Sequence, residues 1–345
     1  MNGVKHFPFF LALGLCVLAS ACAHLPVSPA QTDFLKLIDR PRVPLAPEVT
    51  ELPPTNNIAE FHFTYASEAG QRVPGLLWKE TNSTGRRPVV IVLHGTGGSK
   101  QGMAGLCYKY ATNGFIAVAI DGRYSGERMK SGKGAEEYNK AIVRAYYDGR
   151  EHPLFYDTVW DVMRLVDYLQ TRDDVDGKRI GLIGISKGGT ETYLTAAVDK
   201  RIAVAVPCIG VQSFGWALDH DAWRGRIESF QTAFDNVVKG EGVRPDAAFM
   251  KKFYDRVAPG IYGEFDGPVM LPLIAPRPLL VINSDSDVRS PLPGVWLCIQ
   301  AAEKVYINAK AQDRFAVDIQ AKTAHKVNAD SEQKAIEWFV KWLKP

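Results

Sequence analysis

Five nearly continuous apolar runs constrain the fold of this 345-residue chain more than any other feature of its sequence. They lie at residues 89–93, 115–120, 180–185, 203–206 and 279–282. Strands that are buried on both faces have this pattern, because helices cover each side of a parallel sheet. Stretches with apolar residues at spacings of three and four, such as residues 157–169, separate the runs and predict helices. We therefore expect an α/β protein with a mostly parallel, doubly wound sheet.

The alternation of expected strands and helices opens with a hairpin, is interrupted once by an insertion, and closes with a strand and a helix. Residues 61–65 and 73–78 predict an opening β-hairpin, and a final strand at 315–319 precedes an amphipathic helix at 331–343. After the sixth expected strand, residues 211–270 form a Trp- and Phe-rich, mostly helical insertion. We expect this insertion to be a cap over the carboxyl edge of the sheet, where open α/β sheets bind ligands. Its Trp216 and Trp223 are candidate substrate-pocket residues, although ordinary packing within the cap explains any one of these aromatics equally well.

The first 60 residues differ in composition from the rest. Residues 1–22 contain one Lys, an apolar run at 7–18 and small residues before Cys22. This is the pattern of a secretory signal peptide, and the run is too short to span a bilayer. Residues 23–60 are rich in Pro and predict a strand-poor lead-in without a chemical role. The main domain is then expected over residues 61–345.

Composition excludes several classes of function. The 41 Lys and Arg residues nearly balance the 38 Asp and Glu residues, which disfavours both a disordered chain and a nucleic-acid binder that relies on a basic surface. The five Cys residues form no C-x-x-C pair, so we do not expect a metal enzyme. Cys107, Cys208 and Cys298 are expected as buried thiols, with at most one disulfide among them.

A nucleophile motif follows the third buried run. Gly184, Ser186 and Gly188 have G-x-S-x-G spacing, which places a serine on a sharp turn between a strand and a helix. The spacing alone is only suggestive, but here the motif does lie between an apolar run and a helix-like stretch at 190–198. Ser186 is therefore the candidate nucleophile.

A serine nucleophile needs a base and an acid that orients the base. Only His325, among the seven histidines, lies between the final expected strand and the final helix, where this fold carries its base. The acid is expected on the loop after residues 279–282, which offers Asp285 and Asp287. An aspartate in such a loop more often stabilises a turn, and this reading applies to either residue.

The glycine-rich loop at residues 93–98 follows an earlier buried run. Its backbone N–H groups can point at the same place as the N–H of Lys187, so Thr96 and Lys187 are the candidate oxyanion-hole donors. Taken alone, the loop could equally be a flexible turn.

The loops at 94–98, 119–128 and 184–189 resemble those of the α/β-hydrolase superfamily, in its dienelactone hydrolase, acetyl xylan esterase and prolyl oligopeptidase-like branch. The resemblance covers residues 61–345. It implies a serine esterase without metal or cofactor, in which Ser186 attacks the ester carbonyl and His325 transfers the proton. The backbone N–H groups of Thr96 and Lys187 would hold the oxyanion.

The same resemblance favours Asp287 over Asp285 as the orienting acid. Related hydrolases carry Gly-x-x-Asp-x-x-x-Pro on this loop, and Ser284 to Pro291 matches except for Ser in place of Gly. Two differences from members of this branch narrow the range of expected activities. Dienelactone hydrolases use Cys where this chain has Ser186, and about 60 residues cannot form the β-propeller of the family's peptidases.

The residues before Cys22 resemble a bacterial lipobox, with Leu18 one position earlier than usual. We expect Cys22 to be lipidated in an exported periplasmic or outer-membrane lipoprotein; plain cleavage after Ala21 or Ala23 is the alternative. The expected function is a carboxylesterase for small-acyl or carbohydrate-linked esters. Expected partners are a small-molecule or glycan ester, no nucleic acid, and a membrane only through the lipid. A peptidase or amidase with the same triad, and a silent hydrolase-like binding protein, are the alternatives.

Overall fold

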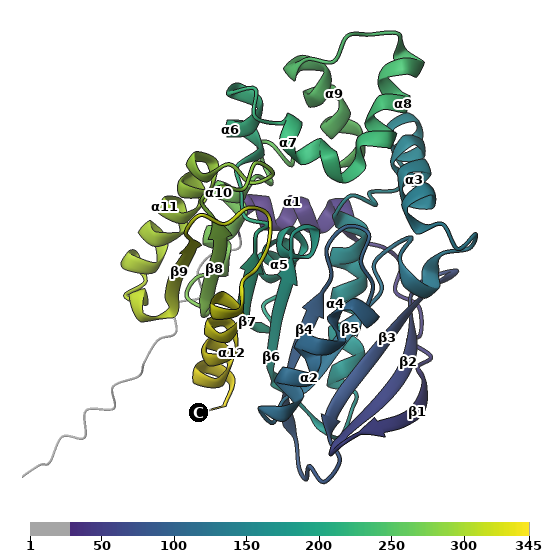
Figure 1. Cartoon of the computed structure of the whole chain (residues 1–345), viewed down its shortest axis with the longest axis vertical. Coiled ribbons are helices and arrows are strands. Elements are labelled where there is room, and N and C mark those ends of the chain that lie inside the picture. The colour runs from purple at the N-terminus through teal and green to yellow at the C-terminus, as the bar shows by residue number, and fades with distance from the viewer. Residues whose placement is uncertain (1–27, 345) are drawn as a thin grey trace, which may run out of the picture.

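The computed structural model describes residues 28–344, so the expected signal peptide and Cys22 lie outside the described residues. Within 28–344 the chain forms one nine-stranded sheet with the order β1-β2-β3-β5-β4-β6-β7-β8-β9 (Figure 1). The strands are β1 (Glu48–Thr55), β2 (Ile58–Glu68), β3 (Gln71–Glu80), β4 (Arg87–Leu93), β5 (Ile116–Ile120), β6 (Val175–Ile185), β7 (Ile202–Cys208), β8 (Leu279–Ser284) and β9 (Phe315–Gln320). Strands β4 to β9 pair in parallel, whereas β1, β2 and β3 are antiparallel. The expected mostly parallel α/β sheet is confirmed.

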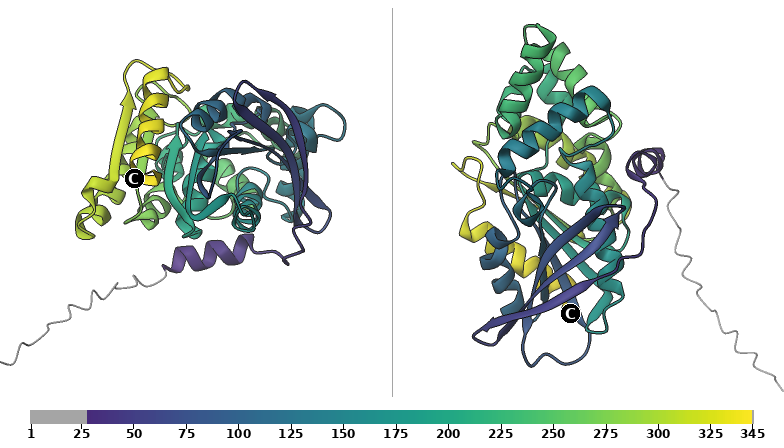
Figure 2. Two further views of the ribbon diagram at one scale, coloured as in Figure 1. Left: turned by 90° about the horizontal axis from the view of Figure 1, so that it is seen from below. Right: turned by 90° about the vertical axis from the view of Figure 1, so that its right-hand side faces the viewer.

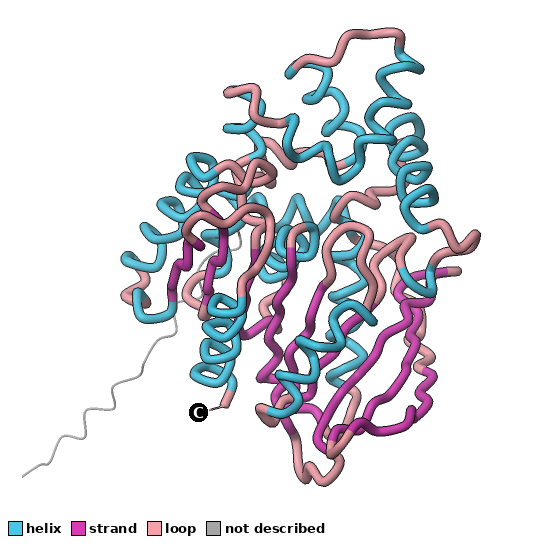
Figure 3. The backbone as a smooth tube through the Cα atoms, viewed as in Figure 1, coloured by secondary structure: helices cyan, strands magenta, loops and turns pink. Residues whose placement is uncertain are grey.

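Helices cover both faces of this sheet and its carboxyl edge. They are α1 (Pro29–Ile38), α2 (Ala104–Thr112), α3 (Gly134–Asp148), α4 (Tyr156–Gln170), α5 (Lys187–Val198), α6 (Phe214–Asp219), α7 (Arg224–Ile227), α8 (Gln231–Glu241), α9 (Ala247–Val257), α10 (Gly267–Met270), α11 (Leu292–Asn308) and α12 (Ala329–Leu343). Figure 3 shows the carboxyl ends of the parallel strands meeting loops that lie beneath the cap helices. None of the helices in the described part of the chain is long and apolar enough to cross a bilayer.

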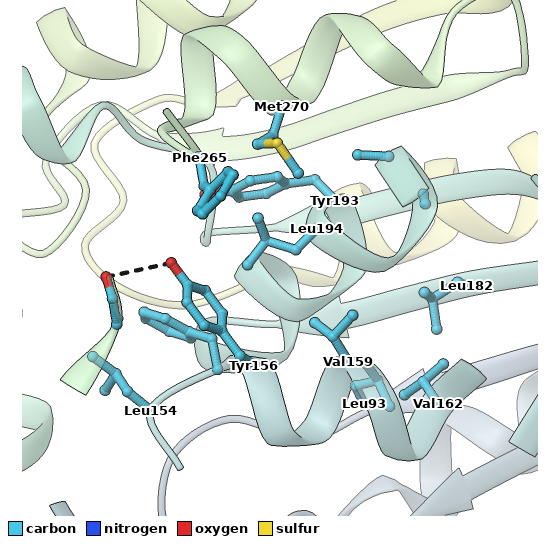
Figure 4. Packing of buried hydrophobic residues seen from close by; sticks show 14 of the residues in the cluster. Leu93, Leu154, Tyr156, Val159, Val162, Leu182, Tyr193, Leu194, Phe265 and Met270 are labelled. Atoms are coloured by element: carbon cyan, nitrogen blue, oxygen red, sulfur yellow. Dashed lines mark hydrogen bonds between the residues drawn. The ribbon is translucent and has the colours of Figure 1, made fainter. Parts of the chain in front are cut away.

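Strand β4 shows why the apolar runs are continuous. Val89 and Ile91 pack into a cluster with α4 and α5, whereas Val90 and Val92 pack with α2 and α12 on the other face. Because successive side chains of a strand point to opposite faces, a sheet covered on both sides needs apolar residues at every position. Figure 4 shows the α4 and α5 side of this core, where the Tyr156 hydroxyl donates to the Ala258 carbonyl at 3.3 Å.

The expectation of a strand-poor lead-in over residues 23–60 is wrong for its described part. Helix α1 buries Phe34 and lies outside α4 and α5, and β1 pairs with β2 (Figure 2). Three of these prolines occupy positions that tolerate a missing N–H, and the two in β1 lie where its pairing with β2 is interrupted. Pro29 is the first residue of α1, and Pro53 and Pro54 lie in the edge strand β1. The fold therefore includes residues 29–60, ahead of the expected domain start at residue 61.

The cap has two sources in the sequence. Helices α6 to α10 lie in the expected insertion. The insertion follows β7, which was the sixth of the expected strands because β1 was not predicted. Helix α3, from the connection between β5 and β6, packs against α8 and α9. Tyr146 of α3 stacks on Phe253 of α9 with ring centroids 5.6 Å apart. The cap is thus anchored to the sheet through α3 as well as through its own ends.

Candidate active site

Ser186 lies on a strained turn between β6 and α5. Its φ of 59° and ψ of −113° are unusual for a residue with a side chain. A Cβ atom on Gly184 would lie 2.2 Å from the Gly188 carbonyl oxygen, and one on Gly188 would lie 2.6 Å from the Leu93 carbonyl oxygen. Both glycines of the motif are therefore required by close backbone contacts, and the turn presents the serine hydroxyl at the carboxyl edge of the sheet.

Three strand ends bring Ser186, His325 and Asp287 into one hydrogen-bonded chain. His325 follows β9, and its Nε2 is 2.7 Å from Ser186 Oγ. Asp287 follows β8, and its Oδ2 is 2.7 Å from His325 Nδ1. A carboxylate only accepts hydrogen bonds, so we assign the proton to Nδ1, which leaves Nε2 free to accept from the serine hydroxyl. The imidazole is thus oriented as a base toward Ser186.

Asp287 is buried, and its surroundings favour the ionised form. Burial raises the pKa of this carboxyl, but hydrogen bonds from His325 and the Arg289 backbone N–H outweigh that effect, so its pKa lies below the ordinary value. The buried cation of Arg226 in α7 lowers the pKa of Asp287 further. Arg226 also donates to Ser290 Oγ at 2.9 Å, which links the cap to the Asp287 loop.

Asp285 has a different position. Its carboxylate accepts the backbone N–H of Lys322 at 2.8 Å and that of Thr323 at 3.2 Å. These residues lie on the loop that carries His325. Asp285 therefore stabilises the loop that carries His325, which is the turn-stabilising role considered for these aspartates. Of the two, Asp287 alone contacts the imidazole.

The two expected oxyanion donors both lie close to Ser186. Thr96 lines a cavity of about 330 Å³ together with Ser186 and His325. Lys187 is the first residue of α5, where a backbone N–H has no acceptor within the helix. The Lys187 side chain points elsewhere and forms a buried ion pair with Glu191. Only its backbone N–H can act at the site.

His94 is a supporting residue that the sequence did not single out. Its Nδ1 is 2.7 Å from the Gly95 carbonyl, and its Nε2 accepts the Gly122 N–H at 3.0 Å. Burial lowers the pKa of His94 to about 4, so the ring is neutral near neutral pH. This ring ties the loop after β4 to the loop after β5. A lone histidine at the start of a glycine-rich loop carries no sequence signal for such a role.

Buried ion pairs hold the loop after β5. The Asp121 carboxylate accepts Lys100 Nζ at 2.6 Å and the Lys100 backbone N–H at 2.8 Å. Arg123 and Arg128 both pair with Asp161 of α4, whose pKa they lower against the effect of burial. Because single buried charges are costly, these pairs keep the segment at 121–128 in one conformation beside the site.

The candidate pocket tryptophans do not line the cavities beside Ser186. Trp223 is buried in the cap, with its ring centroid 5.9 Å from that of Phe234. Trp216 stacks on His220 at 4.3 Å. The packing alternative therefore holds for both residues, and the prediction of substrate-pocket tryptophans is wrong in this structure.

Within residues 28–344 no group of three or more His, Cys, Asp or Glu side chains is arranged to hold a metal ion. Cys107, Cys208 and Cys298 are buried free thiols, as expected.

Comparisons with known proteins place the chain among esterases. The protein YtaP of Bacillus subtilis is 26% identical over 286 residues, which cover 79% of this chain and 84% of YtaP. A 4-O-methyl-glucuronoyl methylesterase of Hypocrea jecorina is 25% identical over 285 residues, which cover 79% of this chain and 56% of that enzyme.

Solved acetyl xylan esterases share the fold at low identity. The enzyme of Paenibacillus sp. R4 superposes with a TM-score of 0.66 at 18% identity, covering 91% of this chain and 93% of that enzyme. The enzyme of Thermoanaerobacterium sp. JW/SL YS485 superposes with a TM-score of 0.66 at 19% identity, covering 92% of this chain and 95% of that enzyme.

The acetyl xylan esterase (AXE1) family pattern matches residues 40–213, just over half of the chain. The match begins well before residue 61 and includes the loops at 94–98, 119–128 and 184–189. The expectation of an α/β hydrolase that acts on ester bonds is confirmed, and the chain belongs to the acetyl xylan esterase (AXE1) family.

Proposed function

We propose that this chain is a serine carboxylesterase that removes small acyl groups from carbohydrate-linked esters through an acyl-enzyme. The observation that carries the proposal is the hydrogen-bonded chain of Ser186, His325 and Asp287, with both hydrogen bonds at 2.7 Å, at the wall of a cavity of about 330 Å³. The base is within hydrogen-bond reach of both the nucleophile and the orienting acid.

Each group has one task in the reaction. Ser186 Oγ attacks the ester carbonyl carbon while His325 Nε2 takes its proton, and the oxyanion is held by the N–H groups of Thr96 and Lys187. The tetrahedral intermediate expels the alcohol, which leaves with the proton from His325. A water molecule then attacks the acyl-enzyme, with His325 again as the base, and the acid product leaves. Asp287 stabilises the imidazolium in both halves of the reaction.

The size and the walls of the cavity support a small acyl group. About 330 Å³ is near the small end of ligand pockets, which span roughly 300 to 1,000 Å³. Leu106, Ile185 and Val327 supply apolar contact, and Arg289 lies at the same cavity. The related enzymes are named for acetylated xylan and for glucuronoyl methyl esters, which supports a carbohydrate as the alcohol or the acid part.

A substrate panel tests this proposal. We expect kcat/KM to fall from p-nitrophenyl acetate to the octanoate, and acetylated xylo-oligosaccharides to be deacetylated by wild-type protein but not by the Ser186→Ala variant. A preference for aminoacyl-nitroanilides would indicate a peptidase instead. Absence of turnover on every ester would favour a silent binding protein.

We also propose export with a lipid on Cys22, which rests on the residues at 1–22. Bacterial expression with the natural leader tests it, by the mass of the mature N-terminal peptide and by membrane fractionation. The Cys22→Ala variant should lose both the lipid mass and the membrane association. A wild-type chain that starts after Ala21 or Ala23 without lipid would overturn the proposal.

A further inference from the structure

The loop that carries Asp287 is packed against the cap. A Cβ atom on Gly225 of α7 would lie 2.1 Å from the Val288 carbonyl oxygen, so the backbones of the two segments are in direct contact. One residue further along the loop, the Arg289 side chain pairs at 3.0 Å with Glu228, which directly follows α7. Because Asp287 also accepts the Arg289 backbone N–H at 2.9 Å, these contacts bear directly on the position of its carboxylate.

Arg226 supplies the buried contact between α7 and this loop. It is only 4% exposed, and it donates to Ser290 Oγ at 2.9 Å. We orient the Gln212 amide so that its oxygen faces the guanidinium, and this oxygen then accepts from Arg226 Nε at 2.8 Å. In the same orientation the Gln212 NH₂ group donates to the Arg289 carbonyl at 2.9 Å. One guanidinium thus holds the loop at Ser290 directly and at Arg289 through Gln212.

The charge of Arg226 favours the same arrangement of the loop. Its hydrogen-bond partners within the described residues are a neutral hydroxyl and a neutral amide. Burial lowers the pKa of Arg226, and interactions with Tyr254 and Asp287 oppose that effect. Because a buried cation without a nearby anion is costly, the ionised Asp287 is most stable where it is in this structure, beside Arg226 and hydrogen-bonded to His325.

We propose that Arg226 is a positioning residue of the triad, which fixes the loop at 287–290 from the cap so that the Asp287 carboxylate faces His325 Nδ1. It acts on the reaction only through Asp287. The inference rests on the proposed reaction of Ser186, His325 and Asp287, to which it adds a residue from outside the triad. It also makes the cap part of the catalytic arrangement, because a cap displaced from this loop would release the acid.

Hydrolysis of p-nitrophenyl acetate by Arg226→Met tests the role, because Met keeps an apolar stem but neither the charge nor the donors. We expect kcat to fall about 10- to 100-fold while KM stays within about threefold of the wild-type value, since a displacement of about 1 Å in a catalytic group can cost about 100-fold. Arg224→Met is the matched control. Arg224 lies two residues earlier in α7, with an exposed side chain over the Trp223 ring, and its replacement should leave kcat unchanged.

Combination with Asp287→Asn separates positioning from general damage to the cap. Arg226→Met should lower kcat less than about threefold in the Asp287→Asn protein, because the carboxylate that it positions is already absent. Ser290→Ala, a smaller change that removes one acceptor of Arg226, should lower kcat about three- to tenfold in the wild-type background and not in Asp287→Asn. If Arg226→Met fails to fold, the Ser290→Ala cycle decides alone. Equal factors in the two backgrounds, or an unchanged kcat in either folded single variant, would overturn the positioning role.

The position of Asp287 can also be measured without turnover. The proton that His325 Nδ1 donates to Asp287 should give a low-field proton NMR signal, which we expect in the wild-type and Arg224→Met proteins and not, or only weakly, in Arg226→Met. An undiminished signal in Arg226→Met would overturn the positioning role even if the protein is an active esterase. Loss of the signal in Arg226→Met, in a protein whose wild type hydrolyses no ester, would support the positioning role and reject the proposed function alone.

Discussion

Replacing Asp287 by Asn tests the role of the carboxylate in the hydrogen-bonded chain. In the wild-type protein Asp287 accepts the Nδ1 proton of His325 at 2.7 Å and the Arg289 backbone N–H at 2.9 Å. Asn can keep the second contact with its carbonyl oxygen, and its NH₂ group then faces His325. The imidazole must adopt the other tautomer, with its proton on Nε2 and directed at Ser186 Oγ. That nitrogen can no longer accept the serine proton.

The expected loss follows from the loss of the base. In serine hydrolases the same tautomer change lowers kcat by about 10,000-fold, and this corresponds to about 5 kcal/mol of transition-state stabilisation. Asp285→Asn is the matched control, because it lies two residues away and contacts only the loop of His325 through Lys322 and Thr323. We expect less than a tenfold effect from the control, since an amide oxygen still accepts one of those N–H groups.

The assay is initial-rate hydrolysis of p-nitrophenyl acetate, with circular dichroism and thermal unfolding to show that both variants are folded. If the Asp285→Asn variant were the inactive one, the orienting acid would be Asp285. If Asp287→Asn kept more than a tenth of the wild-type kcat, the tautomer argument would be refuted.

Two further predictions concern the loops that frame the site. His94 is neutral when folded, with a pKa of about 4, so unfolding takes up a proton between that pH and about 6.5. As the pH is lowered from about 6.5 to about 4, urea titrations should show the free energy of unfolding falling, with His94 contributing about 3 kcal/mol of the loss. His94→Gln should flatten this slope, and an unchanged slope would disprove the assignment. Gly188→Ala places a Cβ atom 2.6 Å from the Leu93 carbonyl oxygen and should lower kcat at least about 100-fold by displacing the turn. Gly105→Ala, which meets no atom within 4 Å, should leave kcat unchanged and should not lower stability, since Ala favours the helix α2 more than Gly does. Equal loss of kcat in the two variants would contradict the steric argument.

The local patterns of the sequence were sufficient for the sheet and the nucleophile turn. A strand buried on both faces must be apolar at every position, and a turn with Ser186 between close backbones needs glycine on both sides. These requirements act within a few residues, so they are visible in the sequence. The order of strands in this kind of fold indicated His325 and the loop that carries both Asp285 and Asp287.

Contacts between distant segments were not visible in the same way. The prolines of residues 29–54 indicate an irregular segment only when their neighbours are unknown. In the structure Pro29 lies at a helix start, and Pro53 and Pro54 lie on an edge strand. Helix α3 joins the cap through α8 and α9, which lie about a hundred residues later in the chain. Trp223 could not be assigned to core or pocket, because an aromatic side chain suits both. The choice between Asp285 and Asp287 was settled geometrically only by the packing of two loops.

The role of Ser186 as the nucleophile is measured most directly by covalent labelling with a fluorophosphonate, followed by intact-protein mass spectrometry and peptide mapping. We expect one adduct per folded wild-type chain, located on Ser186, with labelling abolished in Ser186→Ala and strongly slowed in Asp287→Asn. Heat-denatured protein should not react, because the activated hydroxyl exists only when Ser186 and His325 are held at 2.7 Å. An adduct on another residue, or undiminished ester hydrolysis by Ser186→Ala, would contradict this role.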